Sequence, residues 1–475
     1  MKIASVVSSF KDSTILRNFS LLTVSNIFTQ ILGISTSIKI ARFVNPTVFG
    51  TYNLLQLHVS VFVVIASLGL KNIVVRTVAR DKLNSKRVFF VALMLKAVIL
   101  LVSLISYSIY FLFLKAYGHY LFEITLLTII ALSVYDIVEG VAFGLERMQY
   151  TSIINFAINL LWIIILLAIP GSLFTLNLLY EIYFILNALK TVVYFIALRK
   201  TGCLTGGADD VNWKENALYI IKQSLPYYYL NLLTLVSNQI PILFLEYRSG
   251  VEQVGFFNIA NKILTPMNLI LNTALIALFP NLSKIFISDN QLFVKRVKHI
   301  FVIISLLGIV GAFAVTFFRT EAISIIYGKK YISSVLVLSY QCWYMALYSL
   351  VCLIGTLLGA IDRQKELGYL SIVSTVIQVP ILWVGSKYGA EYLSAAFLVA
   401  TIIGFVIHAF VINNFLKHSL KFSFFVKIFL GFVVAYIISI LIPGQLNFLI
   451  KCVLFIFIMT AALYVLYNKY KGVKT

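Results

Sequence analysis

The chain has 475 residues, of which 61% are hydrophobic and 12% are charged. Soluble domains are typically about 45–50% apolar and about 25% charged, so this composition excludes an ordinary soluble protein and indicates a polytopic membrane protein. The formal net charge of +21 is typical of membrane proteins whose cytoplasmic loops collect lysine and arginine, and it gives no reason to expect a nucleic-acid partner.

A membrane-spanning helix needs about 20 mostly apolar residues. About fourteen segments meet this requirement, which predicts an all-α polytopic membrane protein. We expect these helices at residues 19–41, 49–70, 88–114, 121–144, 151–169, 176–198, 223–245, 255–280, 299–318, 335–358, 369–385, 393–416, 427–443 and 446–467.

Basic residues gather in alternate loops, as Lys71, Arg76 and Arg80 do after the second segment. Because cytoplasmic loops carry the excess of Lys and Arg, we expect both termini in the cytoplasm and an even number of spans. The connection from residue 71 to residue 87 and the outside connection 319–334 are expected to be loops.

An internal repeat is visible in the sequence. Residues 50–53 (GTYN) align with 255–258 (GFFN), and residues 144–147 (GLER) resemble 360–363 (AIDR). Transporters built from such repeats bind their substrate between the two halves. We therefore expect two related lobes of six helices each, around one cavity.

The repeat also sets the expected domain boundaries. The most polar connection lies near the middle of the chain and links the two lobes. The predicted parts are an N-terminal lobe at 1–200, a cytoplasmic linker at 201–222, a C-terminal lobe at 223–416, and helices 13 and 14 with a cytoplasmic tail at 417–475.

The motifs of several enzyme classes do not occur in the chain. It has no Walker loop, no H-E-x-x-H zinc helix and no G-x-S-x-G nucleophile elbow, and its cysteines form no C-x-x-C pair. The N-terminus lacks a short apolar core followed by a small-residue cleavage site. We therefore expect a transporter rather than an enzyme, with no catalytic residue, metal site, cofactor or removable signal peptide.

Polar residues inside apolar helices are costly in lipid, so they normally face the bundle interior or water. We expect Lys39, Lys96 and Lys262 to form a cationic cavity for an anionic substrate, with amide side chains beside them. For Lys39 and Lys96 the alternative is that each side chain extends to a membrane surface. The candidate substrate-binding residues are Lys262, Lys39, Lys96, Asn258, Asn261, Asn26 and Gln30.

Two acidic residues inside the fourth segment, Asp136 and Glu139, share one face of the helix because they are three positions apart. They either carry a coupling proton or sodium ion, or neutralise a lysine across the bundle. Lys190 in the sixth segment is expected to pair with Glu181 or another neighbour. His58 is expected to be a packed helix residue rather than a proton relay.

Short stretches near the N-terminus carry a family resemblance. The chain resembles the polysaccharide transporter family of the O-antigen flippase (Wzx) type, within the multidrug/oligosaccharidyl-lipid/polysaccharide (MOP) exporter superfamily. One feature departs from the lipid II flippase of this group, which has arginines in its first helix where this chain has Gln30 and Thr36. The stretches that carry the resemblance are 16–19 (LRNF), 41–43 (ARF), 49–52 (FGTY), 69–70 (GL), 79–80 (AR) and 255–257 (GFF).

The resemblance implies a function in O-antigen and lipopolysaccharide biosynthesis. Members of this type move an undecaprenyl-diphosphate-linked oligosaccharide across the bacterial inner membrane by alternating access. The resemblance also implies a polymerase and a chain-length regulator as partners, with H⁺ or Na⁺ as the coupling ion.

Two other functions are compatible with parts of the sequence. A MATE-like cation-coupled multidrug antiporter would share the fold, but the interiors of the first and seventh segments lack the carboxylates that such an antiporter would use. An integral-membrane glycosyltransferase would need a sizeable outside loop with catalytic acids, and residues 319–334 offer only Glu321.

Overall fold

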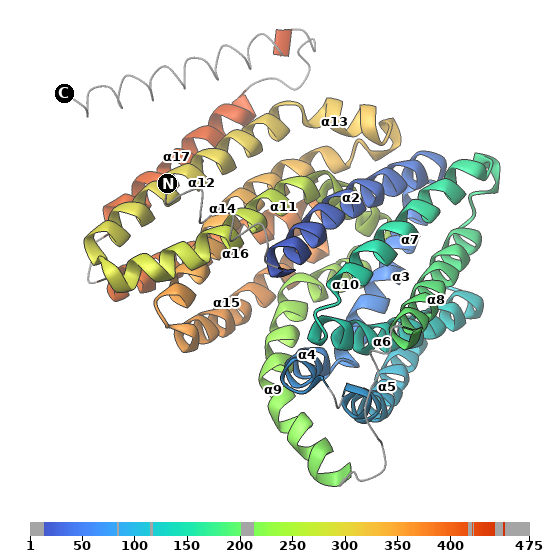
Figure 1. The fold of residues 1–475 in the computed structure, drawn as a ribbon. Coiled ribbons are helices and arrows are strands. Elements are labelled where there is room, and N and C mark those ends of the chain that lie inside the picture. The colour runs from blue at the N-terminus through green and yellow to red at the C-terminus, as the bar shows by residue number, and fades with distance from the viewer. Residues whose placement is uncertain are drawn as a thin grey trace. The chain divides into compact units, whose positions relative to one another are not determined.

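A computed structural model of the chain describes residues 14–82, 85–114, 117–200, 213–416, 420, 422–441 and 450–451. Every regular element in these ranges is a helix (Figure 1). Eleven helices of the described part are long and apolar enough to cross a membrane, which confirms the predicted all-α polytopic fold. The count of about fourteen spans stays a prediction, because segment 446–467 lies almost entirely outside the described residues.

The chain divides into two compact units, Met1–Gly255 and Phe256–Thr475. The lobe boundaries expected from the sequence stay a prediction. Helix α11 (Val251–Ser288) begins in the first unit and continues in the second. The other elements of the first unit are α2 (Thr14–Phe43), α3 (Pro46–Ile65), α4 (Leu70–Arg80), α5 (Ser85–Leu114), α6 (His119–Gly144), α7 (Met148–Ala168), η2 (Gly171–Leu173), α8 (Leu176–Lys200), α9 (Trp213–Asn238) and α10 (Ile240–Ser249). Those of the second unit are α12 (Asn290–Phe317), α13 (Arg319–Ile326), η3 (Lys329–Tyr331), α14 (Ser334–Ala360), α15 (Gln364–Gly385), η4 (Ser386–Tyr388), α16 (Ala390–Phe415) and α17 (Phe422–Leu441).

Each unit packs around one or two central helices. In the first unit α6 contacts α3, α4, α5, α7 and α8, and α2 packs along α7. In the second unit α14 contacts α12, α15 and α16, and α17 packs on α12. The central helices are the most enclosed, as Val138 of α6 and Leu353 of α14 show by being fully buried.

Three connections differ from the sequence prediction. The expected basic loop after the second segment contains the amphipathic helix α4, whose Leu70, Ile73 and Val74 pack into a core with α6. The expected segment 223–245 lies within one candidate membrane span, Ile220–Ser249, but the helix is interrupted at Gln239 between α9 and α10. The expected outside loop contains α13 and η3. The charged and polar residues of the two expected loops predict exposed coil, whereas the helical spacing of their apolar residues favours the short helices that form there.

The aligned stretches 144–147 and 360–363 fold into the same turn. Glu146 after α6 and Asp362 after α14 both have a φ of +60°. In both turns the next residue's N–H donates to a carbonyl five residues back, Arg147 to Ala142 and Arg363 to Leu358, each at 2.8 Å. This is the Schellman arrangement that ends many helices, so the repeat seen in the sequence corresponds to equal local geometry.

The aligned glycines Gly50 and Gly255 lie against each other where α3 meets the first turn of α11. A Cβ at Gly255 would lie 2.6 Å from the carbonyl oxygen of Pro46, and a Cβ at Gly50 would overlap the carbonyl of Val251. Only residues without a Cβ permit this approach of two helix backbones. The Asn45 side chain caps the start of α3 by accepting from the Val48 N–H at 2.8 Å.

We expect Gly50→Ala to lower the free energy of unfolding by about 1–3 kcal/mol, because its methyl group would overlap backbone that cannot rotate away. The matched control is Gly33→Ala in α2, where a Cβ meets nothing within 4 Å. There the higher helix propensity of alanine should leave stability equal or higher by up to about 1 kcal/mol. Thermal unfolding in detergent measures both. Equal effects of the two substitutions would show that the crossing does not need glycine.

Candidate functional site

The most densely charged cluster of the described residues lies inside the first unit, where α4, α5 and α6 meet. Lys96 of α5 is 1% exposed, and its Nζ lies 3.0 Å from Asp136 Oδ2. Lys71 of α4 forms an ion pair with Glu139, and its Nζ lies 3.9 Å from Asp136 Oδ1. Asp136 and Glu139 of α6 are therefore both partnered by lysines from neighbouring helices.

A third lysine, Lys190 of α8, completes this cluster. Its Nζ lies 4.1 Å from the centre of the Tyr135 ring, where the negative face of the ring attracts a cation. The Tyr135 hydroxyl donates to Glu139 Oε1 at 2.9 Å and lies 3.3 Å from Asn155 Oδ1. Lys190 makes no ion pair with any residue that the structure describes.

The charges of this cluster do not balance. Lys71, Lys96 and Lys190 face two carboxylates, so one positive charge is in excess. The lysines differ in access, because the side chain of Lys71 is 32% exposed and that of Lys96 is 1% exposed. Burying charges costs free energy even when they are paired, so a cluster with an unmatched cation is better suited to binding an anion than to stabilising the fold. We call these three lysines, together with Asp136 and Glu139, the lysine cluster.

The structure places the other predicted residues of the first unit on α2. Lys39 is half-buried, and its Nζ lies 4.5 Å from the centre of the Phe43 ring. Asn26 is exposed. Gln30 is half-buried, and its Oε1 is enclosed without a hydrogen-bond partner among the described residues.

The predicted residues of the second unit lie on α11. Lys262 is half-buried and forms no ion pair with a described residue. Asn261 is exposed and its carbonyl accepts from the Thr265 hydroxyl at 3.2 Å. Asn258 is half-buried. These residues lie in a different unit from the lysine cluster, and the single cavity expected from the sequence stays a prediction.

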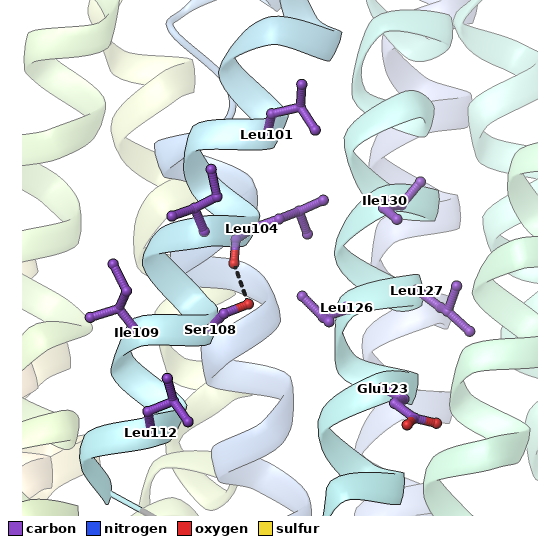
Figure 2. A pocket seen from close by; sticks show the side chains of 10 residues that line it. Leu101, Leu104, Ser108, Ile109, Leu112, Glu123, Leu126, Leu127 and Ile130 are labelled. Atoms are coloured by element: carbon purple, nitrogen blue, oxygen red, sulfur yellow. Dashed lines mark hydrogen bonds between the residues drawn. The ribbon is translucent and has the colours of Figure 1, made fainter.

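An open groove between α5 and α6 has a different character. Figure 2 shows leucine and isoleucine side chains from both helices along the groove, while the Ser108 hydroxyl donates back to the Leu104 carbonyl at 2.9 Å. Glu123 is the one charged residue of the lining. An apolar groove without a cation offers nothing to a diphosphate. Elsewhere in the described part of the chain, no three His, Cys, Asp or Glu side chains gather as a metal site would require.

Comparison with known proteins assigns the family. Residues 15–286, more than half of the chain, match the family described as "Polysaccharide biosynthesis protein". The chain belongs to this family. The match contains the lysine cluster and the start of α11. No curated protein sequence matches the chain.

Solved structures of transporters share the fold. The chain is similar to a structure described as "Lipid II flippase MurJ, inward closed conformation", with a TM-score of 0.68 at 14% identity over 95% of this chain and 99% of that one. An inward-facing multidrug resistance MATE family transporter of the MOP superfamily matches with a TM-score of 0.63 at 13% identity, over 82% and 96% of the chains. The Vibrio cholerae MATE transporter VcmN in its bent form matches with a TM-score of 0.55 at 15% identity, over 87% and 99%. The protein is therefore a multi-pass membrane protein with the MOP transporter fold.

Sequence reasoning missed Lys71 and Lys190 as members of the site. Lys71 was assigned to a loop, although the apolar spacing of Leu70, Ile73 and Val74 indicates a helix face that would carry Lys71 into the bundle. The sequence predicts a partner for Lys190 in Glu181 or another neighbour, but the Glu181 carboxylate bonds to the Tyr120 hydroxyl, and Lys190 lies over the Tyr135 ring. A tyrosine ring as the neighbour of a lysine leaves no signal in sequence spacing.

We expect Lys96→Met to lower the free energy of unfolding by about 3–5 kcal/mol, because it leaves the Asp136 carboxylate without its buried partner. The double variant Lys96→Met/Asp136→Leu should recover most of this loss, because it removes both charges. Thermal unfolding in detergent measures both.

The control for this experiment is Lys82→Met, which breaks an ion pair with Glu146 whose side chains are 50% and 62% exposed. Exposed pairs contribute only about 0.2–1 kcal/mol, so the control should unfold almost as the unmodified chain does. A double variant less stable than Lys96→Met alone would contradict the assigned pairing.

Proposed function

We propose that this protein is a flippase for undecaprenyl-diphosphate-linked oligosaccharide repeat units. It moves the unit of O-antigen or a similar surface polysaccharide, for lipopolysaccharide biosynthesis, across the bacterial inner membrane by alternating access. Both termini lie in the cytoplasm. A polysaccharide polymerase and a chain-length regulator act on the same substrate as partners.

The observation that carries this proposal is the unmatched positive charge of the lysine cluster in a chain of the polysaccharide biosynthesis family. A diphosphate that leaves water for a low-dielectric interior needs charge-assisted partners to offset its desolvation. A membrane protein that keeps an extra buried ammonium group is therefore suited to an anionic substrate.

The lysines have different roles in the proposed mechanism. Lys190 is the ammonium group that the diphosphate contacts first, because no carboxylate occupies it. Lys71 follows, since it is partly exposed and can exchange Glu139 for a phosphate oxygen. Lys96 stays with Asp136 and holds the carboxylate in place. Each lysine acts as a point charge, because it lacks the bidentate fork of arginine.

The remaining predicted residues are proposed to bind along the path of the substrate. Lys39 and Lys262 supply further positive charge. Amide side chains hydrogen-bond to sugar hydroxyls as donors and acceptors. The amides proposed for this role are Asn26, Gln30, Asn258 and Asn261.

The ion-coupling role expected for Asp136 and Glu139 receives less support from the geometry than the alternative. Both carboxylates form ion pairs with lysines from neighbouring helices, which is the arrangement that the neutralising role requires. We therefore favour the role of neutralising lysines for this pair.

A second candidate function is a MATE-like cation-coupled multidrug antiporter. The observation in its favour is the similarity to MATE transporter structures. An excess of buried positive charge would repel a cationic drug, so the lysine cluster favours the flippase. Loss of resistance to cationic dyes in a deletion strain, without accumulation of any lipid-linked sugar, would reverse this choice.

We expect a strain lacking the gene to accumulate complete repeat units on undecaprenyl diphosphate at the cytoplasmic face of the membrane. Lys190→Met and Lys262→Ala should accumulate them too. Each removes one charge-assisted contact of about 1.5–3 kcal/mol, which slows transport roughly ten- to a hundredfold. Mass spectrometry of extracted lipid-linked sugars measures the accumulation and identifies the sugars.

The control strain carries Lys82→Met, whose side chain is half-exposed and lies outside the lysine cluster. It should show no accumulation. Immunoblots of membranes establish that each variant is present. Normal transport by Lys190→Met at normal abundance would contradict the role of the lysine cluster.

A further inference from the structure

A second buried polar cluster lies in the first unit, apart from the lysine cluster. It joins His58 of α3 to Glu246 of α10, with His58 Nε2 3.3 Å from Glu246 Oε2. His58 is fully buried and Glu246 is 6% exposed. Helix α5 contributes Tyr110 to this cluster and Lys96 to the lysine cluster. The two residues are fourteen positions apart, or about 21 Å along a helix, so the clusters are separate.

Tyrosine hydroxyls complete the cluster from α5 and the connection after it. The Tyr110 hydroxyl donates to Glu246 Oε2 at 2.8 Å. The Tyr117 hydroxyl lies 2.6 Å from His58 Nδ1 and 3.5 Å from the Tyr107 hydroxyl. Both ring nitrogens of His58 therefore have a polar partner, and so does one oxygen of Glu246.

The second carboxylate oxygen, Glu246 Oε1, is buried without a hydrogen-bond partner among the described residues. Within the same residues His58 is the ion-pair partner of Glu246. Besides each other, the side chains in hydrogen-bond or ring contact with the pair among the described residues are neutral, namely Tyr107, Tyr110 and Tyr117.

Glu246 Oε2 is placed to accept from both the Tyr110 hydroxyl and His58 Nε2–H, and an ionised carboxylate is a group that only accepts hydrogen bonds. With a neutral imidazole, the cluster then carries one buried negative charge. Buried charges that lack a counter-charge are strongly unfavourable. The charge is neutralised if one proton is added.

The proton can be added at His58 Nδ1 without movement of any heavy atom. In the neutral imidazole Nδ1 accepts from the Tyr117 hydroxyl. After protonation Nδ1–H donates to the same oxygen, and the hydroxyl hydrogen turns toward Tyr107. A hydroxyl group serves as donor or acceptor by rotation, so His58 Nδ1 has a hydrogen-bond partner in both charge states.

We propose that His58, with Glu246 as its counter-ion, binds the proton that drives transport in this protein. The coupling role of this proton rests on the proposed flippase function. Proton binding by His58 does not depend on which substrate is transported. It assigns coupling to the His58–Glu246 cluster rather than to Asp136 and Glu139, whose charges are already matched by lysines.

The position of the cluster connects protonation to the backbone. Glu246 lies four positions before Gly250, where φ is +89° and α10 ends. The next residue, Val251, begins α11 and packs its carbonyl against Gly50 of α3. Helix α3 therefore contacts α10 through the His58–Glu246 pair and contacts α11 through Gly50. These two contacts lie on either side of Gly250, so a change of charge at His58 alters the contact of α3 with the end of α10 next to this break.

The test uses the full chain in lipid nanodiscs, with nitrogen-labelled histidine and NMR detection of imidazole protonation across pH. The chain has five histidines, and the His58 signal is the one lost in His58→Gln. We expect a titration of His58 whose midpoint moves to lower pH in Glu246→Gln, because this variant removes the counter-charge of the imidazolium. His58 nitrogens that stay in one state at every pH would overturn the proposal, as would an unchanged midpoint in Glu246→Gln.

Transport in vesicles provides the second measurement. An imposed pH gradient should accelerate transport by the unmodified chain and fail to accelerate it in His58→Gln. The matched control is His408→Gln, because His408 is also buried in a helix but its Nδ1 lies 2.8 Å from the Gly404 carbonyl oxygen, and no carboxylate among the described residues pairs with it. Acceleration by a sodium gradient alone, or retained acceleration in His58→Gln, would overturn the proposal. If His58 titrates as expected while no lipid-linked sugar is moved, the flippase function fails and the proton site stands.

Discussion

The structure depends on matching charge inside an apolar bundle. An ammonium or carboxylate group that leaves water must find a partner, because the hydrocarbon surroundings supply none. This requirement explains why the basic α4 lies against α6, since Lys71 reaches Glu139 only if Leu70, Ile73 and Val74 are buried there. Two clusters in one unit meet the requirement in opposite ways. The lysine cluster has one cation too many, and the His58–Glu246 cluster has one anion too many when its imidazole is neutral.

The sequence predicts the positions of the helices better than it predicts the contacts of the site. Helix positions depend on length and apolar content, which are local properties, so most segments were predicted within a few residues. The break at Gln239 and the helix α4 were missed because each depends on what the segment packs against. The site depends on pairs distant in sequence. Lys71 and Glu139 are 68 residues apart, and His58 and Glu246 are 188 residues apart. One sequence contains no information on which helix faces meet, so His58 was predicted correctly as buried while its carboxylate partner was not found.

Two aligned stretches of the sequence end their helices with the same backbone geometry. Stretches 144–147 and 360–363 share only their arginine, yet both end a helix with the same two backbone hydrogen bonds and the same left-handed residue. Glu146 and Asp362 adopt this conformation although glycine is the usual choice. The two turns therefore keep one geometry although three of their four residues differ.

The crossing of Gly50 with the start of α11 limits how this protein can change over evolution. Exposed apolar positions such as Leu101 and Ile105 can change to other apolar residues without a clash. Gly50 and Gly255 cannot carry a side chain unless a helix backbone moves. A relative that lost one of these glycines would need a wider spacing between the two helix backbones at this crossing.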